Sequence, residues 1–430
     1  MWPGFCLRIP HEDVAVAEKI ERYLGKDTII ILTGQRRIGK SYILRLFRDK
    51  MSRDATANVI FIDKEKHEFD DIKTYRDLNA YIDARRDKGK TNFILVDEIQ
   101  DIDEFEKSVR SYYEEADVEI VVTGSNSKML SSDLSTLIGG RYKEINIQAL
   151  SYEEFMLFHQ LADSDDTLAR YIQFGGLPGL LKMGLDEQDA REYQQDVYHT
   201  VLLKDVIMRN RIRNVPLLEN LVRFLADNTG KIISANGIAK YMKSQGDNVT
   251  STVIINYTKF LCDAYLIHKV NRYDIHGKRL FESNDKFYFE DNGLRNALAG
   301  GSREGDIEKV IENIVYNHLI RLGYEVTVGQ LQAGERLRER LRVGATAGMG
   351  ERSSGMIDFV CQKPKGQRVY VQAAYIIADE ATRTREFGNL RAIRDNYPKY
   401  VISMTPLVSR QDSDGITHLH LRRFLTEGLE

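Results

Sequence analysis

The sequence has little cysteine, little proline and no long apolar run. Its three cysteines, Cys6, Cys262 and Cys361, are scattered along 430 residues, which excludes a disulfide scaffold or a zinc ribbon and is typical of a reducing compartment. The seven prolines argue against long disordered linkers. No apolar run approaches the roughly 18 residues that cross a bilayer, and the amino-terminal residues lack the apolar core of a secretory signal. We therefore expect a cytoplasmic protein with no membrane partner.

An excess of charge of one sign is also absent. The chain carries 61 Lys and Arg against 64 Asp and Glu, a net charge of −3. Global charge therefore does not indicate nucleic-acid binding, and any such surface must be local. The length suggests two to four domains at roughly 100–200 residues each. With 42% hydrophobic and 29% charged residues, the composition is that of an ordinary globular protein.

Strands alternate with helices over the first 150 residues. Short β-branched runs predict the strands, and apolar spacings of three and four residues predict the helices. Such alternation is typical of parallel strands with helices on both faces, so we predict an α/β fold with a parallel sheet. The expected strands are 28–33, 58–63, 92–97 and 119–124, and the expected helices are 40–51, 74–86 and 104–115.

A phosphate-binding motif follows the first strand. Gly34-Gln35-Arg36-Arg37-Ile38-Gly39-Lys40-Ser41 fits G-x-x-x-x-G-K-[ST] and lies between an expected strand and an expected helix, as the motif requires. Its glycines let backbone N–H groups wrap a phosphate chain at the helix N-terminus. Lys40 is the candidate for the β- and γ-phosphates, and Ser41 is the candidate for Mg²⁺. The motif predicts ATP and Mg²⁺ as ligands, and the alternative is a chance glycine turn with a solvated lysine.

A second motif supplies two acids. Residues 93–98, FILVDE, are four apolar residues followed by Asp97 and Glu98, and a buried strand delivers such acids to the carboxyl edge of the sheet. We predict that Asp97 holds the Mg²⁺ shell and that Glu98 orients and polarises the attacking water. Glu98 and Lys40 are thus the candidate catalytic residues. The alternative for Glu98 is an ordinary surface acid.

Three later polar residues are further candidates for nucleotide binding. Ser125 and Asn126 follow the strand 119–124, at the same sheet edge, where they would sense the γ-phosphate. Turns also use these residue types, so both interpretations stay open. Arg141, in GGRYKEI, would face a phosphate of its own or of a neighbouring subunit, or it is an ordinary arginine after a glycine pair.

Five stretches, GQRRIGKS, ILVDE, VVTGSNS, GGR and GGLPGLL, resemble the AAA-type ATPases of bacteria and archaea that are related to the STAND signal-transduction ATPases and carry a C-terminal domain of unknown function. The stretches 199–214, 221–242 and 287–298 add to the resemblance, which leaves out only the first dozen residues and 335–355. It implies that the turn Gly176-Leu177-Pro178 contacts the nucleotide, so Pro178 joins the candidates. The alternative is a helix–helix turn. The resemblance also implies that oligomers can form.

The pattern along the chain predicts four parts. Residues 1–150 would form a P-loop AAA-type ATPase core, 151–214 a helical subdomain, 215–300 a winged helix-turn-helix and 301–430 a C-terminal α/β nuclease-like domain with an irregular loop at 330–356. Within that loop, 335–355 is rich in Arg and then in Gly, Ala and Ser. This composition favours a surface loop over a basic arm for nucleic acid.

The part at 215–300 has the order of a winged helix. Helical patterns at 217–230, 234–246 and 250–266 precede strands with a turn at 274–277. Basic side chains there would meet DNA phosphates, and polar ones would face bases. Winged helices are also protein-interaction modules, so DNA is a candidate partner beside protein. The basic candidates are Lys243, Lys259, Lys269, Arg272, Lys278 and Arg279, and the polar ones are Ser251, Thr252 and Asn256.

The C-terminal part resembles the restriction-endonuclease-like fold with an incomplete site. That fold needs a helix glutamate, a strand aspartate and E-x-K on the next strand to hold a metal and assist a water. Glu312 and Asp358 match the first two, but the third is Gln372-Ala373-Ala374. A neutral amide is a poor ligand for a hard dication, and no lysine remains in the motif. We expect an inactive nuclease fold that binds a protein or nucleic-acid partner.

Three functions are compatible with these patterns. The leading one is an ATP-binding and ATP-hydrolysing switch, whose nucleotide state sets the geometry of the winged helix and the C-terminal domain. The second is a DNA-binding regulator in which ATP is only a ligand. The third is a metal-dependent nuclease.

Overall fold

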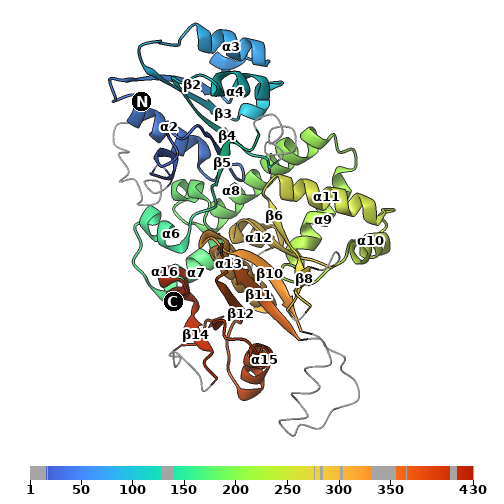
Figure 1. Ribbon diagram of the computed structural model, residues 1–430. Coiled ribbons are helices and arrows are strands. Elements are labelled where there is room, and N and C mark those ends of the chain that lie inside the picture. The colour runs from blue at the N-terminus through green and yellow to red at the C-terminus, as the bar shows by residue number, and fades with distance from the viewer. Residues whose placement is uncertain are drawn as a thin grey trace.

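The computed structural model describes residues 16–429, except 17, 128–138, 276, 281–283, 301–303, 332–354, 365 and 407–413. Nearly all of the Arg-rich stretch at 335–355 therefore lies outside the described residues. Figure 1 shows three tiers, with one sheet at the top, a layer of helices in the middle and a second sheet at the bottom.

The first sheet has five strands, and every pair of neighbours in it is parallel. The strand order is β2-β3-β4-β1-β5, which confirms the predicted parallel-strand core. Because β4 lies between β1 and β3 and all three strands are parallel, their carboxyl ends lie at the same edge of the sheet. The bounds are β1 (Ile29–Thr33), β2 (Ala57–Asp63), β3 (Thr91–Asp97), β4 (Val118–Gly124) and β5 (Tyr142–Asn146).

Helices cover both faces of this sheet. Ile30 and Leu32 of β1 pack in one core cluster with Phe47 of α2, whereas Ile29 and Ile31 pack with residues of α3 and α4. Successive strand side chains point to opposite faces, so a strand between two helical layers must be apolar throughout. The bounds are α2 (Lys40–Met51), α3 (Tyr75–Asp83) and α4 (Phe105–Tyr113), with 3-10 turns η1 (His67–Phe69) and η2 (Ile99–Asp101).

The middle tier is helical and begins with a capping box. The Ser151 side chain accepts a hydrogen bond from the Glu154 amide, and the Glu154 side chain accepts one from the Ser151 amide, which satisfies two free N–H groups at the start of α6. Helix α8 runs without a break into a π-helix, η5. The bounds are α6 (Tyr152–His159), α7 (Asp165–Phe174), the 3-10 helix η4 (Pro178–Met183), α8 (Glu187–Thr200) and η5 (Val201–Met208).

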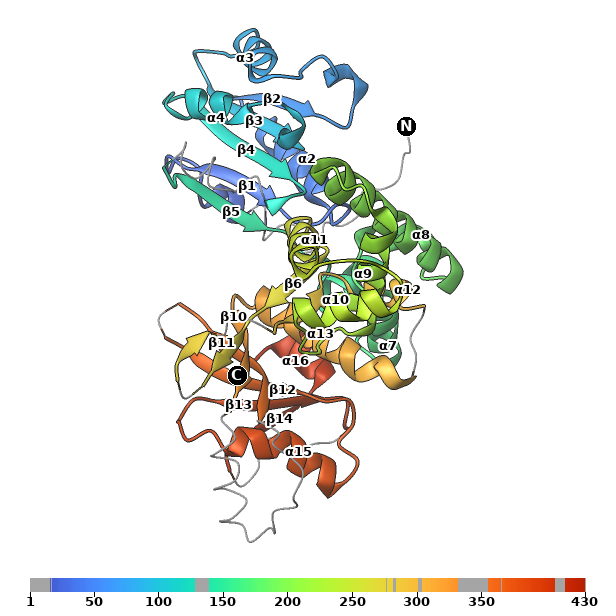
Figure 2. The same ribbon diagram turned by 90° about the vertical axis from the view of Figure 1, so that its right-hand side faces the viewer.

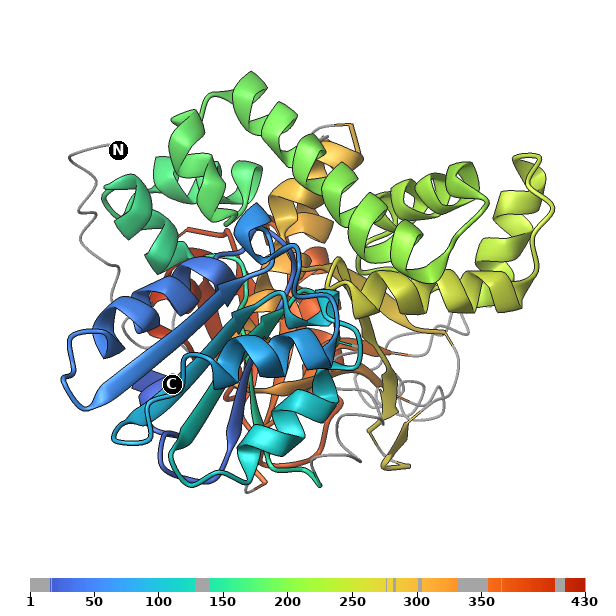
Figure 3. The same ribbon diagram turned by 90° about the horizontal axis from the view of Figure 1, so that it is seen from above.

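Three helices and a two-stranded sheet follow. Helices α9 (Val215–Asp227), α10 (Ala235–Ser244) and α11 (Ser251–Asp263) lie where the sequence predicts them, and they project to one side of the first sheet (Figure 3). Strands β6 (Ile267–Val270) and β9 (Lys286–Phe289) pair antiparallel. Helix α12 (Asn292–Leu298) then packs against α7, α8 and α9. The assignment of this part as a winged helix stays a prediction.

The second sheet crosses the predicted boundary at residue 300. Its order is β14-β13-β12-β11-β10-β7-β8, so β7 (Arg272–Asp274) pairs with β10 of the C-terminal part, and β8 (Arg279–Leu280) joins the sheet through β7. Figure 2 shows this sheet at the opposite end of the molecule from the first one. The predicted domain boundaries stay predictions. The other bounds are β10 (Glu325–Gln330), β11 (Met356–Gln362), β12 (Arg368–Ala373), β13 (Lys399–Ser403) and β14 (Thr417–His420).

Helices also cover both faces of the second sheet. Phe359 and Val371 pack with α13 and α16, while Tyr370 and Val401 pack with Phe387 of α15. Among the described helices, none is long and apolar enough to span a membrane. The bounds are η6 (Glu304–Asp306), α13 (Ile307–Arg321), α15 (Glu380–Arg391) and α16 (Leu421–Glu427).

Candidate functional site

The phosphate-binding motif forms the turn between β1 and α2. Gly34 has φ 138°, and a Cβ atom there would lie 2.2 Å from the Ile147 carbonyl oxygen, so only glycine fits. Ile38 is buried in the core beneath the loop, and Lys40 is the first residue of α2, after Gly39 with φ 106°. The loop therefore has the strand–turn–helix setting in which backbone N–H groups bind phosphates.

Polar groups of the loop are held inside it. The Lys40 ammonium donates to the carbonyl oxygens of Gly34 and Gln35, each at 2.9 Å, and Lys40 is buried. Burial lowers the pKa of Lys40, and Glu98 opposes this effect. Both side-chain amide atoms of Gln35 are buried with no hydrogen-bond partner among the described residues. Buried polar atoms usually have partners, so the loop fits a polar ligand.

Asp97 ends β3 beside the phosphate loop. The Thr123 hydroxyl donates to its Oδ1 at 2.5 Å, whereas its Oδ2 is buried with no hydrogen-bond partner among the described residues. Burial raises the pKa of Asp97 to about 6, although the hydroxyls of Thr123 and Ser41 lower it. The Asp97 carboxylate and the adjacent Ser41 hydroxyl supply oxygen atoms that fit the shell of a Mg²⁺ ion, which prefers oxygen ligands and retains waters.

Glu98 has a strained backbone at the same edge. Its φ of 52° is left-handed, a conformation that non-glycine residues adopt at a cost of about 1–3 kcal/mol and that clusters at functional sites. The Glu98 amide donates to the Thr123 hydroxyl at 2.9 Å, which fixes the turn. Burial raises the pKa of Glu98, but the charges of Lys40 and Arg36 lower it more. The carboxylate is therefore charged and able to accept a proton.

The residues after β4 lie at this edge too. Ser125 and Asn126 are fully buried, and the Ser125 hydroxyl donates to Asp205 at 2.9 Å. Asp205 comes from the π-helix η5, outside the first sheet, and the sequence motifs did not identify it. The sensor role of Ser125 and Asn126 stays a prediction.

Arg141 lies at the other end of the sheet. Its carbonyl oxygen accepts the amide of Ile29, the first residue of β1, at 3.1 Å, and its guanidinium lies 5.7 Å from the Tyr113 ring centre. The phosphate loop follows the last residue of β1, so the structure does not bring Arg141 to the loop of its own chain. A contact with a neighbouring subunit stays a prediction.

Pro178 begins η4, after a turn that is held from two sides. The Gly176 carbonyl accepts the Leu150 amide at 2.8 Å, and the Gly176 amide donates to Asp291 at 2.7 Å. The turn therefore joins the end of the first sheet to the start of α12. A nucleotide contact by Pro178 stays a prediction.

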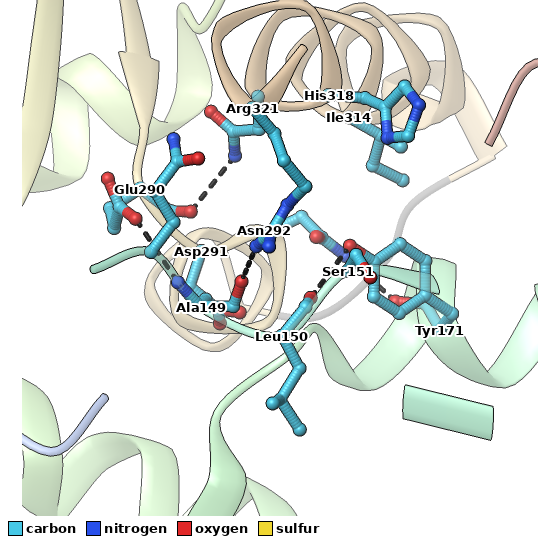
Figure 4. Close-up of a pocket in the computed structure, with 12 residues that line it drawn as sticks. Ala149, Leu150, Ser151, Tyr171, Glu290, Asp291, Asn292, Ile314, His318 and Arg321 are labelled. Atoms are coloured by element: carbon cyan, nitrogen blue, oxygen red, sulfur yellow. Dashed lines mark hydrogen bonds between the residues drawn. The ribbon is translucent and has the colours of Figure 1, made fainter. Parts of the chain in front are cut away.

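A cavity of about 20 Å³ lies beside this turn (Figure 4). It is large enough for one water and far too small for a nucleotide. Buried Asn317 Oδ1 and His318 Nε2 have no hydrogen-bond partner among the described residues, which fits a water site. Burial lowers the pKa of His318 to about 3, and the charge of Arg321 adds to this. The cavity therefore lies where residues 148–151, the start of α12 and helix α13 meet.

The C-terminal acids lie together around a lysine that sequence reasoning missed. Lys286 Nζ lies 2.7 Å from Glu312 Oε1 and 3.0 Å from Asp358 Oδ1, and the Tyr288 hydroxyl donates to Glu312 at 2.6 Å. The motif position still holds Ala374, but a lysine from outside the motif reaches the two acids. Lys286 lies on β9, outside the E-x-K spacing, so no motif pointed to it.

Gln372 takes part in the same cluster without adding a charge. Its amide nitrogen donates to Glu386 at 3.0 Å, while its oxygen accepts the Asp358 amide at 3.3 Å. The described residues contain no group of three His, Cys, Asp or Glu side chains arranged to hold a metal. An ammonium thus lies between the two acids that would hold a divalent cation in a nuclease.

Residues 26–156 match the family model of an AAA domain, AAA_14. This match agrees with the parallel sheet and the phosphate loop. The chain therefore contains an AAA-type P-loop ATPase domain. Residues 165–305 match a domain of unknown function, DUF8612. That one match spans most of the predicted helical subdomain and the predicted winged helix.

The chain belongs to the same family as an uncharacterized protein of Haemophilus influenzae. The two are 30% identical over 418 residues, which cover 95% of this chain and 97% of that protein. The chain is also 28% identical to the uncharacterized protein MJ1544 of Methanocaldococcus jannaschii over 329 residues, 74% of this chain and 72% of that protein.

Solved structures with some similarity to the chain include the following three. The RuvB Holliday junction branch migration motor of Thermotoga maritima is 13% identical, with a TM-score of 0.33 over 61% of this chain and 89% of that one. ORC1 of Aeropyrum pernix, in complex with DNA, is 12% identical, with a TM-score of 0.32 over 67% and 92%. AMPPCP-bound DnaA of Aquifex aeolicus is 12% identical, with a TM-score of 0.29 over 57% and 86%.

Proposed function

We propose that the protein binds ATP with Mg²⁺ at the phosphate loop, hydrolyses the ATP and acts as a nucleotide-dependent switch in the cytoplasm. One observation carries the proposal, which is that buried Lys40, Asp97, Glu98 and Ser125 converge at the carboxyl edge of a parallel sheet. Ligands of open α/β sheets bind at that edge.

The proposal gives each candidate residue a role. Lys40 binds the β- and γ-phosphates, and Ser41 with Asp97 holds Mg²⁺, which when bound neutralises phosphate charge. Glu98 orients the attacking water and accepts its proton, since its carboxylate is kept charged by Lys40 and Arg36. Ser125 and Asn126 sense the γ-phosphate. Pro178 contacts the nucleotide, and Arg141 acts on a neighbouring subunit in an oligomer.

Contacts between the core and α11 support the switch. The Ser127 hydroxyl, two residues after Ser125, donates to Asp263 at the end of α11 at 3.2 Å. Glu144 of β5 accepts both from Thr33, the last residue before the phosphate loop, at 2.7 Å and from Tyr265 at 3.3 Å. A change at the loop therefore has a short route to the proposed winged helix.

The proposed partner of the winged helix is DNA, with protein as the other candidate. Lys243 and Lys259 are exposed, as are Thr252 and Asn256, so all four side chains are free to meet a duplex. Lys269 instead pairs with Asp285 at 3.0 Å, and Arg272 donates to Gln330 at 2.8 Å. The C-terminal domain, with the proposed inactive nuclease-like fold, is the proposed site for a protein partner.

Steady-state ATP hydrolysis with and without duplex DNA tests the proposal. Lys40→Ala should weaken ATP binding by about tenfold or more, because a charge-assisted contact to the phosphates is lost. Lys50→Ala is the matched control, since Lys50 is an exposed lysine of the same helix. Equal ATP affinity of folded Lys40→Ala and Lys50→Ala proteins would refute the site.

DNA binding and DNA cleavage, measured beside ATP hydrolysis, separate the two alternatives. ATP binding without hydrolysis, together with salt-sensitive DNA binding, would favour an ATP-liganded regulator. Metal-dependent cleavage of the DNA would favour a nuclease. DNA-stimulated hydrolysis is the result that the proposed switch predicts.

A further inference from the structure

Asp205 is a buried carboxylate at the nucleotide site that comes from outside the AAA match. It is 1% exposed and lies in the π-helix η5, whose residues Val201, Leu202 and Val206 share a core cluster with Ile38 of the phosphate loop. π-helices are rare and occur frequently at functional sites. The position of Asp205 in such a helix therefore suggests a functional role for this residue.

Asp205 holds Arg36 of the phosphate loop through two hydrogen bonds. Arg36 Nε lies 3.0 Å from Asp205 Oδ2, and Arg36 Nη2 lies 3.2 Å from Oδ1. The same guanidinium donates to Glu65 at 2.8 Å and lies 3.9 Å from Glu98. A bidentate arginine–carboxylate pair fixes geometry as well as charge, so the direction of Arg36 in the loop depends on Asp205.

The same carboxylate also holds the end of β4. Asp205 Oδ1 accepts the Ser125 hydroxyl at 2.9 Å, and Arg209, directly after η5, lies 3.9 Å from that oxygen. One side chain therefore joins the phosphate loop, the strand end with the proposed sensor and the π-helix. Arg36, Ser125 and Asp205 are all buried, where unpaired polar atoms are costly.

We propose that Asp205 is a positioning residue of the ATP site, which orients Arg36 and Ser125 and couples them to η5 and the following helix α9. The inference rests on the proposed function, because it requires ATP at the phosphate loop. Phosphate oxygens and a carboxylate compete for the same guanidinium N–H groups. Nucleotide that recruits Arg36 therefore loosens its pair with Asp205 and alters the helical segment at 201–227.

The test is Asp205→Asn, with Asp196→Asn as the matched control. The amide keeps the shape of the carboxylate but loses the charge and offers Arg36 only one acceptor oxygen. We expect kcat to fall about tenfold or more with an ATP Kd within about threefold of the parent, because positioning affects the transition state more than binding. Asp196 is exposed on α8, so its substitution should leave both values unchanged.

A second readout does not depend on activity. Hydrogen exchange of residues 201–227 should change in the parent protein when AMPPNP and Mg²⁺ are added, and this change should be absent in Asp205→Asn. Arg36→Met and Ser125→Ala, combined with Asp205→Asn, should give non-additive losses, as expected of residues that act as a unit. A merely structural role would lower stability without removing the nucleotide response.

The outcomes distinguish this inference from the proposed function. If the parent protein does not bind ATP, the proposed function fails. If it binds and hydrolyses ATP while Asp205→Asn keeps the parental kcat and exchange response, only the positioning role is overturned. If Asp205→Asn does not fold, the parent protein alone tests the coupling. In that case, hydrogen exchange at 201–227 that does not change when AMPPNP is added overturns it.

Discussion

Lys286 lies 3.0 Å from Asp358, a residue 72 positions further along the chain. The same ammonium lies 2.7 Å from Glu312, so one cation from β9 bridges a helix acid and a strand acid. Burial raises the pKa of Glu312 to about 7, and the Lys286 charge opposes this. The cluster therefore depends on its lysine for charge balance.

We predict that the protein does not cleave DNA or RNA with Mg²⁺ or Mn²⁺. The Lys286 ammonium already pairs with both acids, and Gln372 supplies an amide where a third carboxylate would be required. Incubation of plasmid and single strands with each metal checks this. Cleavage by purified protein that Asp358→Ala abolishes would show that the nuclease site is active.

Replacing the bridging lysine should destabilise the fold. Lys286→Met removes the buried cation from two carboxylates that are themselves only 16% and 13% exposed, and breaking a buried ion pair from one side costs about 3–5 kcal/mol. Lys269→Met is the control, because the half-exposed Lys269 pairs with Asp285 on the neighbouring strand segment and such a pair contributes about 1 kcal/mol or less. Equal thermal stability of the two variants would contradict a structural role for the buried bridge.

Glu98→Gln should separate binding from hydrolysis. The amide keeps the size of the side chain but accepts no proton, so hydrolysis should slow by about 10²–10⁴-fold while ATP stays bound. Single-turnover hydrolysis and equilibrium ATP binding measure the two effects. Glu114→Gln, an exposed acid after α4, should behave as the parent does. A Glu98→Gln protein with the parental rate would remove Glu98 from the mechanism.

His318 should make the protein sensitive to acid. Its pKa is about 3 in the fold because of burial, against about 6.5 in an unfolded chain. The unfolded form therefore gains a proton first as the pH falls below 6.5, and stability drops by about 2 kcal/mol at pH 5. His318→Gln should lose less thermal stability than the parent between pH 7.5 and pH 5.

The comparison of variants isolates this histidine. Buried Asp291, whose pKa burial raises to about 6, contributes the opposite trend, but it is common to both proteins. His67→Gln, at an exposed position, is the control. Identical pH dependence in the parent and in His318→Gln would exclude His318 as a source of acid sensitivity.

Much of the first sheet could be predicted from the sequence, because strong local signals coincide there. The apolar run at 92–97 has the length and β-branched content of a buried strand, and the structure has β3 at Thr91–Asp97. Gly34 and Lys40 belong to a motif whose spacing follows from backbone geometry. Contacts between distant segments leave no such pattern.

The partners of the site residues could not be predicted, because they come from distant segments of the chain. Asp205 lies 169 positions after Arg36, in a helical stretch whose apolar spacing gives no sign of a polar task. Lys286 lies on a short strand that the sequence assigned to a wing. Only the pairing of β9 and the packing of α13 bring it to Glu312, and both are tertiary effects.

The pairing of β7 with β10 limits how the chain can be dissected. Arg272, Tyr273 and Asp274 are in parallel register with Val328, Gly329 and Gln330. A protein shortened at residue 305, where the second family match ends, would expose the backbone N–H and C=O groups of β7 along one side. Open strand edges of this kind recruit other strands and promote aggregation. Removal of the C-terminal part therefore damages the part that remains, and insolubility of such a fragment would reflect a lost sheet neighbour.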